Sequence, residues 1–154
     1  MSKVYNLGYE FEHDYLLLGI NSTLEDYKLA YLLNNTLQLH LKRQAADLDI
    51  KEKNCAFTWY QYYCDKSFTT WSLLANKHIF TSDTQGQVNL FAEESKTAYL
   101  IAEKKTVDYF LKINGGFEDQ DDIKMYQKIK QLNGVVALYN IDPETLRSKD
   151  YLIF

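Results

Sequence analysis

The chain has 154 residues, the size of one domain, and its content of apolar and charged residues is that of an ordinary globular protein. Its net charge of −4 argues against a nucleic-acid partner, because binding to phosphate relies on clustered Lys and Arg. No apolar stretch is long enough to cross a bilayer, and the first residues lack a secretory signal. We therefore expect a single cytoplasmic domain over residues 1–154, without a membrane partner.

Tyrosine is the unusual part of the composition, with 13 Tyr beside 8 Phe and 2 Trp. A tyrosine has an apolar ring and a polar hydroxyl, which suits half-buried sheet faces and also contact surfaces. Aromatic residues favour strands, so packing within a sheet is the simpler explanation of the excess. A binding surface is the alternative.

The first predicted element is a strand over residues 9–20. Residues 15–18 are Tyr-Leu-Leu-Leu, a run suited to a strand that is buried on both faces. The polar residues that begin at Asn21 then interrupt the pattern.

A helix is predicted next, over residues 24–37. Ser22 and Glu25 have the spacing of a capping box, and Thr23 with Asp26 offers an alternative cap one residue later. The apolar stripe expected to face the core consists of Leu24, Tyr27, Ala30, Tyr31, Leu33 and Leu37.

A hairpin that carries both tryptophans is predicted in the middle of the chain. An extended segment around residues 39–44 and a charged turn precede it. Residues 54–63 alternate in the manner of a strand, a short turn follows, and residues 68–75 form a second β-rich run. Trp59 lies on the first of these strands and Trp71 on the second.

Residues 76–97 are the most irregular part of the sequence. Turn signals occur at Ser82-Asp83 and Gln85-Gly86, and Leu90 and Phe91 are apolar anchors. A loop of this length is uncommon in a small domain. The segment is therefore mobile or functional, or it contains a short element that the pattern does not reveal.

The last third has the clearest pattern. Residues 107–113 alternate as a strand, residues 119–132 follow as a helix, and Gly134 marks the end of that helix. Residues 135–141 form another strand, and Pro143 stands at the first position of a helical turn. In the first of these strands the residues expected to share one face are Val107, Tyr109, Leu111 and Ile113.

The order of elements predicts an α+β fold. Two strand-helix-strand units flank a hairpin, which favours one mainly antiparallel sheet with two helices on one face, and we expect a relative of the ferredoxin-like fold. In this arrangement the other face of the sheet is available to a partner or to a second copy of the chain.

The segment Ile101–Tyr109 resembles the motif of a family of small bacterial proteins, the IPExxxVDY family. Further similarities are Gly19-Ile20 followed by Asp26-Tyr27, the Asp142-Pro143-Glu144 step, and the ending Ser148-Lys149 with Leu152 and Phe154, so the resemblance spans nearly the whole chain. Ala102 departs from the motif, which has Pro there, and this change should loosen the lead into the strand. The resemblance implies a bacterial cytosolic protein of one domain, and it implies no activity, cofactor or catalytic residue.

Two acids of this motif have a structural and a functional interpretation. Asp108 can accept hydrogen bonds from backbone N–H groups and fix the start of the strand, while Glu103 lies just outside it. In this interpretation the segment sets register and a turn. In the alternative, Glu103 and Asp108 contact a partner.

No constellation for catalysis or metal binding is evident in the sequence. His13, His40 and His78 are far apart, and Cys55 and Cys64 lack zinc spacing and are not expected to pair in a disulfide. Gly115-Gly116 is expected to form a tight turn, and the acids of residues 118–122 to cap the following helix. We therefore expect no catalytic residues, no metal and no cofactor.

The aromatic hairpin has two interpretations. Trp59, Tyr60, Tyr62 and Trp71 could stack on single-stranded nucleic acid, as aromatic residues do in RNA-recognition modules. The interleaved Arg, Lys and Gly of such modules are missing here. A sheet face packed against the helices is the favoured interpretation.

These observations favour a non-enzymatic protein-binding, adaptor or regulatory domain. Its possible contact residues are Glu103, Asp108, Trp59 and Trp71. The alternative is a regulatory domain that senses a small ligand, and the third possibility is an RNA-binding module or an enzyme without a familiar motif.

Overall fold

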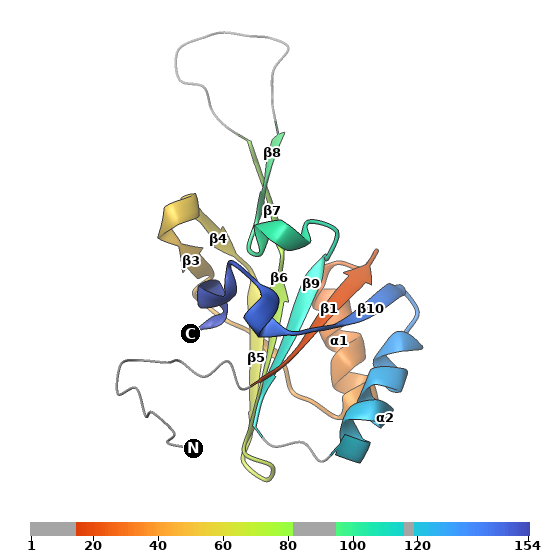
Figure 1. Ribbon diagram of the computed structural model, residues 1–154. Coiled ribbons are helices and arrows are strands. Elements are labelled where there is room, and N and C mark those ends of the chain that lie inside the picture. Colours follow the sequence, from red (N-terminus) through yellow and green to blue (C-terminus); the bar gives the residue numbers. More distant parts are fainter. Residues whose placement is uncertain (1–14, 82–94, 116–118) are drawn as a thin grey trace, which may run out of the picture.

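A computed structural model describes residues 15–81, 95–115 and 119–154. Its centre is a six-stranded antiparallel sheet with two helices, as Figure 1 shows. The helices are α1 (Asp26–Leu37) and α2 (Asp119–Lys130). The strands of the sheet, in spatial order, are β10 (Val135–Ile141), β1 (Tyr15–Ser22), β9 (Tyr109–Asn114), β6 (Thr69–Ala75), β5 (Trp59–Cys64) and β2 (Lys42–Arg43). The predicted α+β class, with a mainly antiparallel sheet, is confirmed.

Several predicted elements agree closely with the structure. The hairpin of both tryptophans is β5–β6, in which Tyr62 pairs with Trp71, and β10 has the predicted bounds. The predicted strand 54–63 is divided, because its first part is a separate strand, β4 (Cys55–Phe57), which pairs outside the main sheet. Gly115 follows β9 with a φ of 112°, a left-handed conformation that suits the predicted glycine turn. The predicted start of the first strand at residues 9–14 and the neighbouring Gly116 lie outside the described residues.

Two small hairpins stand beside the main sheet. One joins β3 (Leu48–Ile50) to β4 (Cys55–Phe57), and the other joins β7 (Lys77–Thr81) to β8 (Ser95–Tyr99). The second hairpin is the element that the irregular pattern of residues 76–97 concealed. Its strands are short and mostly polar, so alternation gave no signal. Residues 82–94, which include Leu90 and Phe91, lie outside the described residues.

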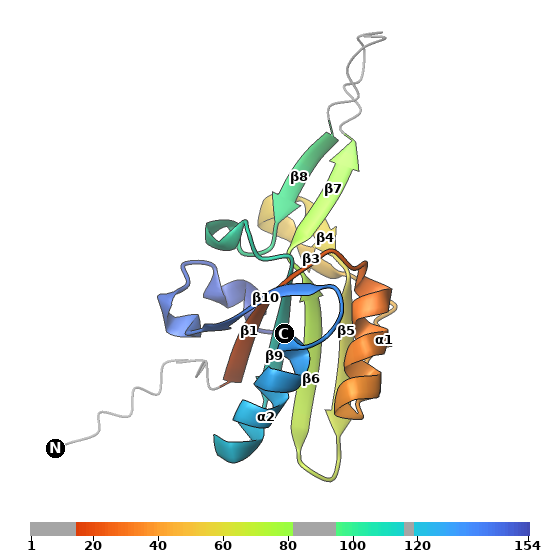
Figure 2. The ribbon, with the colours of Figure 1, turned by 90° about the vertical axis from the view of Figure 1, so that its right-hand side faces the viewer.

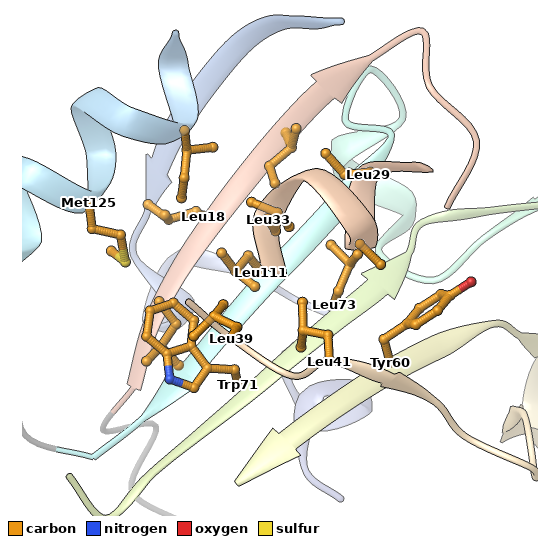
Figure 3. Packing of buried hydrophobic residues seen from close by; sticks show 14 of the residues in the cluster. Leu18, Leu29, Leu33, Leu39, Leu41, Tyr60, Trp71, Leu73, Leu111 and Met125 are labelled. Atoms are coloured by element: carbon orange, nitrogen blue, oxygen red, sulfur yellow. The ribbon is translucent and has the colours of Figure 1, made fainter. Parts of the chain in front are cut away.

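Both helices cover one face of the sheet, where they lie side by side (Figure 2). Figure 3 shows Leu29 and Leu33 of α1 and Met125 of α2 in one cluster with Leu73 and Leu111 of the sheet. This cluster is the larger of two hydrophobic cores, and burial of its apolar side chains is the main force that holds the helices to the sheet.

The predicted stripe of α1 is wrong for its two tyrosines. Tyr27 is 54% exposed and Tyr31 is 64% exposed, whereas Leu29, which the stripe omitted, is completely buried. Leu29 and Leu33 are spaced by four residues and define the buried face. The prediction treated each tyrosine ring as an apolar contact with the core, but both rings lie on the outer face of α1.

The predicted capping box of α1 is not formed either. The helix begins after Glu25, whose side chain makes no capping hydrogen bond. Ser22 Oγ accepts from Leu24 N at 3.0 Å and donates to Gly134 O at 2.7 Å. Ser22 therefore connects the start of α1 to the turn before β10 instead of capping the helix.

The second face of the sheet is covered by the same chain, so the expectation that it lies open to a partner is wrong. Segments from the β3–β4 hairpin, from residues 98–107 and from residues 141–152 pack on it. The buried residues of this second core are Leu17, Ile50, Cys55, Phe57, Leu74, Leu100, Ile101, Val107, Phe110, Ile141, Leu146 and Leu152. Val107 thus packs with Phe110 and not on the predicted face with Tyr109.

Candidate functional site

Glu103 lies in the 3₁₀ turn Ala102–Lys104 and holds a distant part of the chain. Its carboxylate accepts hydrogen bonds from Ser148 N and from Ser148 Oγ, each at 2.8 Å. Burial would raise the pKa of this carboxyl, but the hydrogen bonds from Ser148, together with those from the backbone of Glu103 and Arg147, lower the pKa below its usual value. Glu103 therefore anchors the start of the segment Ser148–Phe154.

Asp108 lies just before β9 and joins two other elements. Its Oδ2 accepts from Ser22 N at 2.9 Å, and its Oδ1 forms an ion pair with Lys77 Nζ at 2.8 Å. This confirms that Asp108 accepts a backbone N–H at the start of the strand. An open recess of about 330 Å³ lies here, and its lining includes Asp26 and Tyr109.

The two tryptophans lie on opposite faces of the sheet. Trp71 is buried in the core below the helices, and its Nε1–H donates to Thr69 Oγ1 at 3.2 Å. Trp59 is half-buried on the other face, donates to Ala46 O at 2.8 Å and lies edge-on to Phe154 with ring centroids 5.0 Å apart. The rings of Trp59 and Trp71 therefore cannot form one stacking platform.

A row of polar residues crosses the second face of the sheet beside Trp59. Lys112 of β9 pairs with Ser72 of β6, and Ser72 pairs with Gln61 of β5. Directly paired residues of antiparallel strands have side chains on the same face. We call this place the Lys112 site, formed by Tyr15, Gln61, Ser72, Lys112 and Phe154.

Lys112 is only 5% exposed, which is rare for a lysine. Its Nζ donates to the carbonyl of Leu152 and lies 4.6 Å from the centre of the Tyr15 ring and 4.3 Å from that of Phe154. No ion pair joins it to a carboxylate within the part of the chain that the structure describes. Burial lowers the pKa of Lys112 to about 8.

Ser72 is the second buried polar residue of this site. It is 1% exposed, and its hydroxyl has no hydrogen-bond partner among the described residues. Buried hydroxyls are nearly always paired, so an unpaired one beside a buried amine is unusual. Sequence reasoning missed both residues, because Lys112 and Ser72 occupy polar positions of alternating strands and such positions normally face solvent.

A second candidate surface lies on the outer side of α1. An open groove of about 450 Å³ is lined by Leu24, Tyr27, Lys28, Tyr31 and Leu32. We call it the α1 groove. It contains four residues with large apolar parts and a single charge, that of Lys28, whose Nζ lies 5.8 Å from the centre of the Tyr27 ring.

Residues with catalytic potential are scattered over the described structure. Cys64 lies at the end of β5, where hydrogen bonds with Ser67 and Tyr62 lower the pKa of its thiol to about 7. His40 contacts the Tyr62 ring and His78 the Phe57 ring. Among the described residues no group of three or more His, Cys, Asp or Glu is arranged to hold a metal ion. His13 lies outside them.

Comparisons with protein-family models, with curated proteins and with solved structures found no match to this chain. None of the helices within residues 15–81, 95–115 and 119–154 has the length and apolar character needed to span a membrane. The Lys112 site and the α1 groove are therefore the two candidate functional surfaces of the described residues.

Proposed function

We propose that this chain is a non-enzymatic protein-binding domain that recognises its partner through the α1 groove. The observation that carries the proposal is the exposure of Tyr27 and Tyr31, one helical turn apart on the same side of α1. Among the described residues only a minority of the large apolar side chains are exposed, and Tyr27 and Tyr31 place two such rings next to each other on one helix. Tyrosine is also enriched among the residues that dominate binding energy in interfaces.

The groove specifies the chemistry of the partner. Its apolar lining suits a partner segment with apolar side chains spaced along a helix or a strand. Lys28 is the only charged residue of the lining, so an acidic residue at the edge of that segment would complement it. Glu103, Asp108 and Trp59 already use their polar groups within the chain, and this favours the α1 groove over them as the contact.

The proposal is tested by photo-cross-linking in the native host. Tyr31 is replaced by the photoreactive amino acid p-benzoylphenylalanine, and the cells are irradiated. We expect one dominant cross-linked protein. Adding Tyr27→Ser should abolish that product without changing the thermal stability of the domain, because the side chain of Tyr27 is exposed.

Ile79 provides the matched control, since it is 69% exposed and lies on β7, away from the groove. The same photoreactive residue at position 79 should not yield that product. If both positions give the same set of products, or if Tyr27→Ser leaves the product unchanged, the α1 groove is not the contact surface.

We further propose that the fold is a relative of the ferredoxin-like fold and that the chain belongs to the IPExxxVDY family. The elements β1, α1, β6, β9, α2 and β10 follow the β-α-β-β-α-β order of that fold, with the remaining strands as additions. The internal hydrogen bonds of Glu103 and Asp108 give the two motif acids structural roles. The cytosol remains the expected compartment.

A further inference from the structure

We propose that Lys112 and Ser72 form a binding site for a small monocarboxylate with an apolar body. This site lies on the second face of the sheet, whereas the α1 groove lies on the helix side. The inference is therefore independent of the proposed protein contact.

Lys112 supplies a positive charge to the site. A buried ammonium group is costly unless it is paired, and the described residues supply no carboxylate. The amine has three N–H donors, and Leu152 O accepts one of them. A carboxylate in the place of that carbonyl would bring a full negative charge to the same donor and remove the cost of the unpaired cation.

Ser72 supplies a hydroxyl next to this charge. Ser72 and Lys112 are direct cross-strand partners, so both side chains project from the same face of the sheet. The hydroxyl is fully buried and unpaired among the described residues, and it can donate to the second oxygen of a carboxylate. The two groups thus match the two oxygens of one carboxylate.

The surroundings specify the rest of the ligand. The ring of Tyr15 lies over the amine, and the ring of Phe154 lies between the amine and Trp59, so Tyr15 and Trp59 would line the space that Phe154 vacates. Aromatic walls favour an apolar body, and a single buried cation favours one negative charge over two. The ring of Phe154 and the carbonyl of Leu152 now occupy the positions that such a ligand would take. Binding therefore requires the segment Ser148–Phe154 to move aside.

The test uses the full chain and three probes at pH 7: phenylacetate, its neutral analogue phenylacetamide, and inorganic phosphate. Binding is followed by the two indole N–H signals in NMR spectra, because Trp59 lies at the site and Trp71 lies on the opposite face. We expect saturable shifts at Trp59 with phenylacetate and none at Trp71. Phenylacetamide and phosphate should each bind at least about tenfold more weakly.

Two variants assign the binding to the proposed residues. Lys112→Met should abolish the phenylacetate shifts while the protein stays folded, since Met fills a similar space without a buried charge. Ser72→Ala should weaken binding about three- to tenfold through the loss of one hydrogen bond. Lys124→Met, at an exposed position of α2, is the matched control and should bind as the unmodified protein does.

Three outcomes would overturn the proposal. The first is the absence of saturable binding of phenylacetate to the unmodified protein. The second is unchanged binding to folded Lys112→Met. The third is equal or tighter binding of phenylacetamide or phosphate, which would show that a carboxylate is not what the site recognises.

Discussion

Glu103 and Ser148 are 45 residues apart in the sequence, and the carboxylate of Glu103 accepts both the backbone N–H and the hydroxyl of Ser148 at 2.8 Å. This contact fixes the point where the segment Ser148–Phe154 begins to cross the second face of the sheet. The same segment provides the carbonyl of Leu152 to Lys112. Glu103 thus anchors the segment that covers the Lys112 site, although Glu103 itself does not contact that site.

Glu103→Ala should therefore destabilise the protein. The loss of two hydrogen bonds to a partly exposed carboxylate should lower the free energy of unfolding by about 1–2 kcal/mol. Urea denaturation measures this change. Glu52→Ala is the control, because Glu52 is exposed in the 3₁₀ turn Lys51–Lys53 and should change stability by less than about 0.5 kcal/mol. Equal stabilities of the two variants would contradict the anchoring role.

The Glu103 contact should also depend on pH. Because the pKa of Glu103 is lowered in the folded state, its contribution is present above the usual value of 4.5 and is lost as the pH falls through the lowered pKa. The difference in unfolding free energy between the unmodified protein and Glu103→Ala should shrink in this acidic range. A difference that stays constant down to the acid transition would count against the contact.

Asp108 should stabilise the protein mainly as a hydrogen-bond acceptor and less through its ion pair with Lys77. Asp108→Ala removes the acceptor for Ser22 N and should cost about 1–2 kcal/mol of stability, as measured by urea denaturation. Lys77→Met removes only the ion pair, which is partly exposed, and should cost less than about 1 kcal/mol. If Lys77→Met is as damaging as Asp108→Ala, the ion pair is the dominant interaction.

Asn76 is completely buried and fully hydrogen-bonded at the end of β6. Its Nδ2 donates to Lys104 O and to Val107 O, and its Oδ1 accepts from Ile101 N, each at 2.8 Å. Asn76→Asp places a carboxylate against two carbonyl oxygens and should lower the melting temperature sharply, with a loss of about 3 kcal/mol or more. Asn35→Asp, at an exposed position of α1, is the control and should have little effect. A stable Asn76→Asp variant would show that the motif segment is held by other contacts.

The buried amine of Lys112 predicts an alkaline effect. Its pKa is about 8 in the folded protein against an ordinary value of 10.5, so between these values the unfolded chain binds a proton that the folded chain does not. Stability relative to Lys112→Met should therefore rise as the pH increases from about 8 to about 10. Urea denaturation over this range measures the difference. The unfolding free energy of Lys124→Met should have the same pH dependence as that of the unmodified protein. If Lys112→Met also has this pH dependence, the pKa of Lys112 is not lowered.

The sequence predicted those features that depend on neighbouring residues. Alternation located β10 with its observed bounds and the β5–β6 hairpin, and the apolar run of residues 15–18 predicted a strand with both faces buried, as β1 has. These predictions succeeded because the periodicity of a strand or helix decides locally which residues can be buried together.

Only the tertiary structure decided which side chains lie under other segments. From alternation alone Lys112 would be expected to face solvent. It is buried because the segment that contains Leu152 and Phe154 packs over it. For the same reason Tyr27 appeared to be a core residue of α1, although the helix turns Leu29 toward the sheet. Burial depends on packing between segments that are distant in the sequence, so a local sequence pattern cannot predict which segments cover a residue.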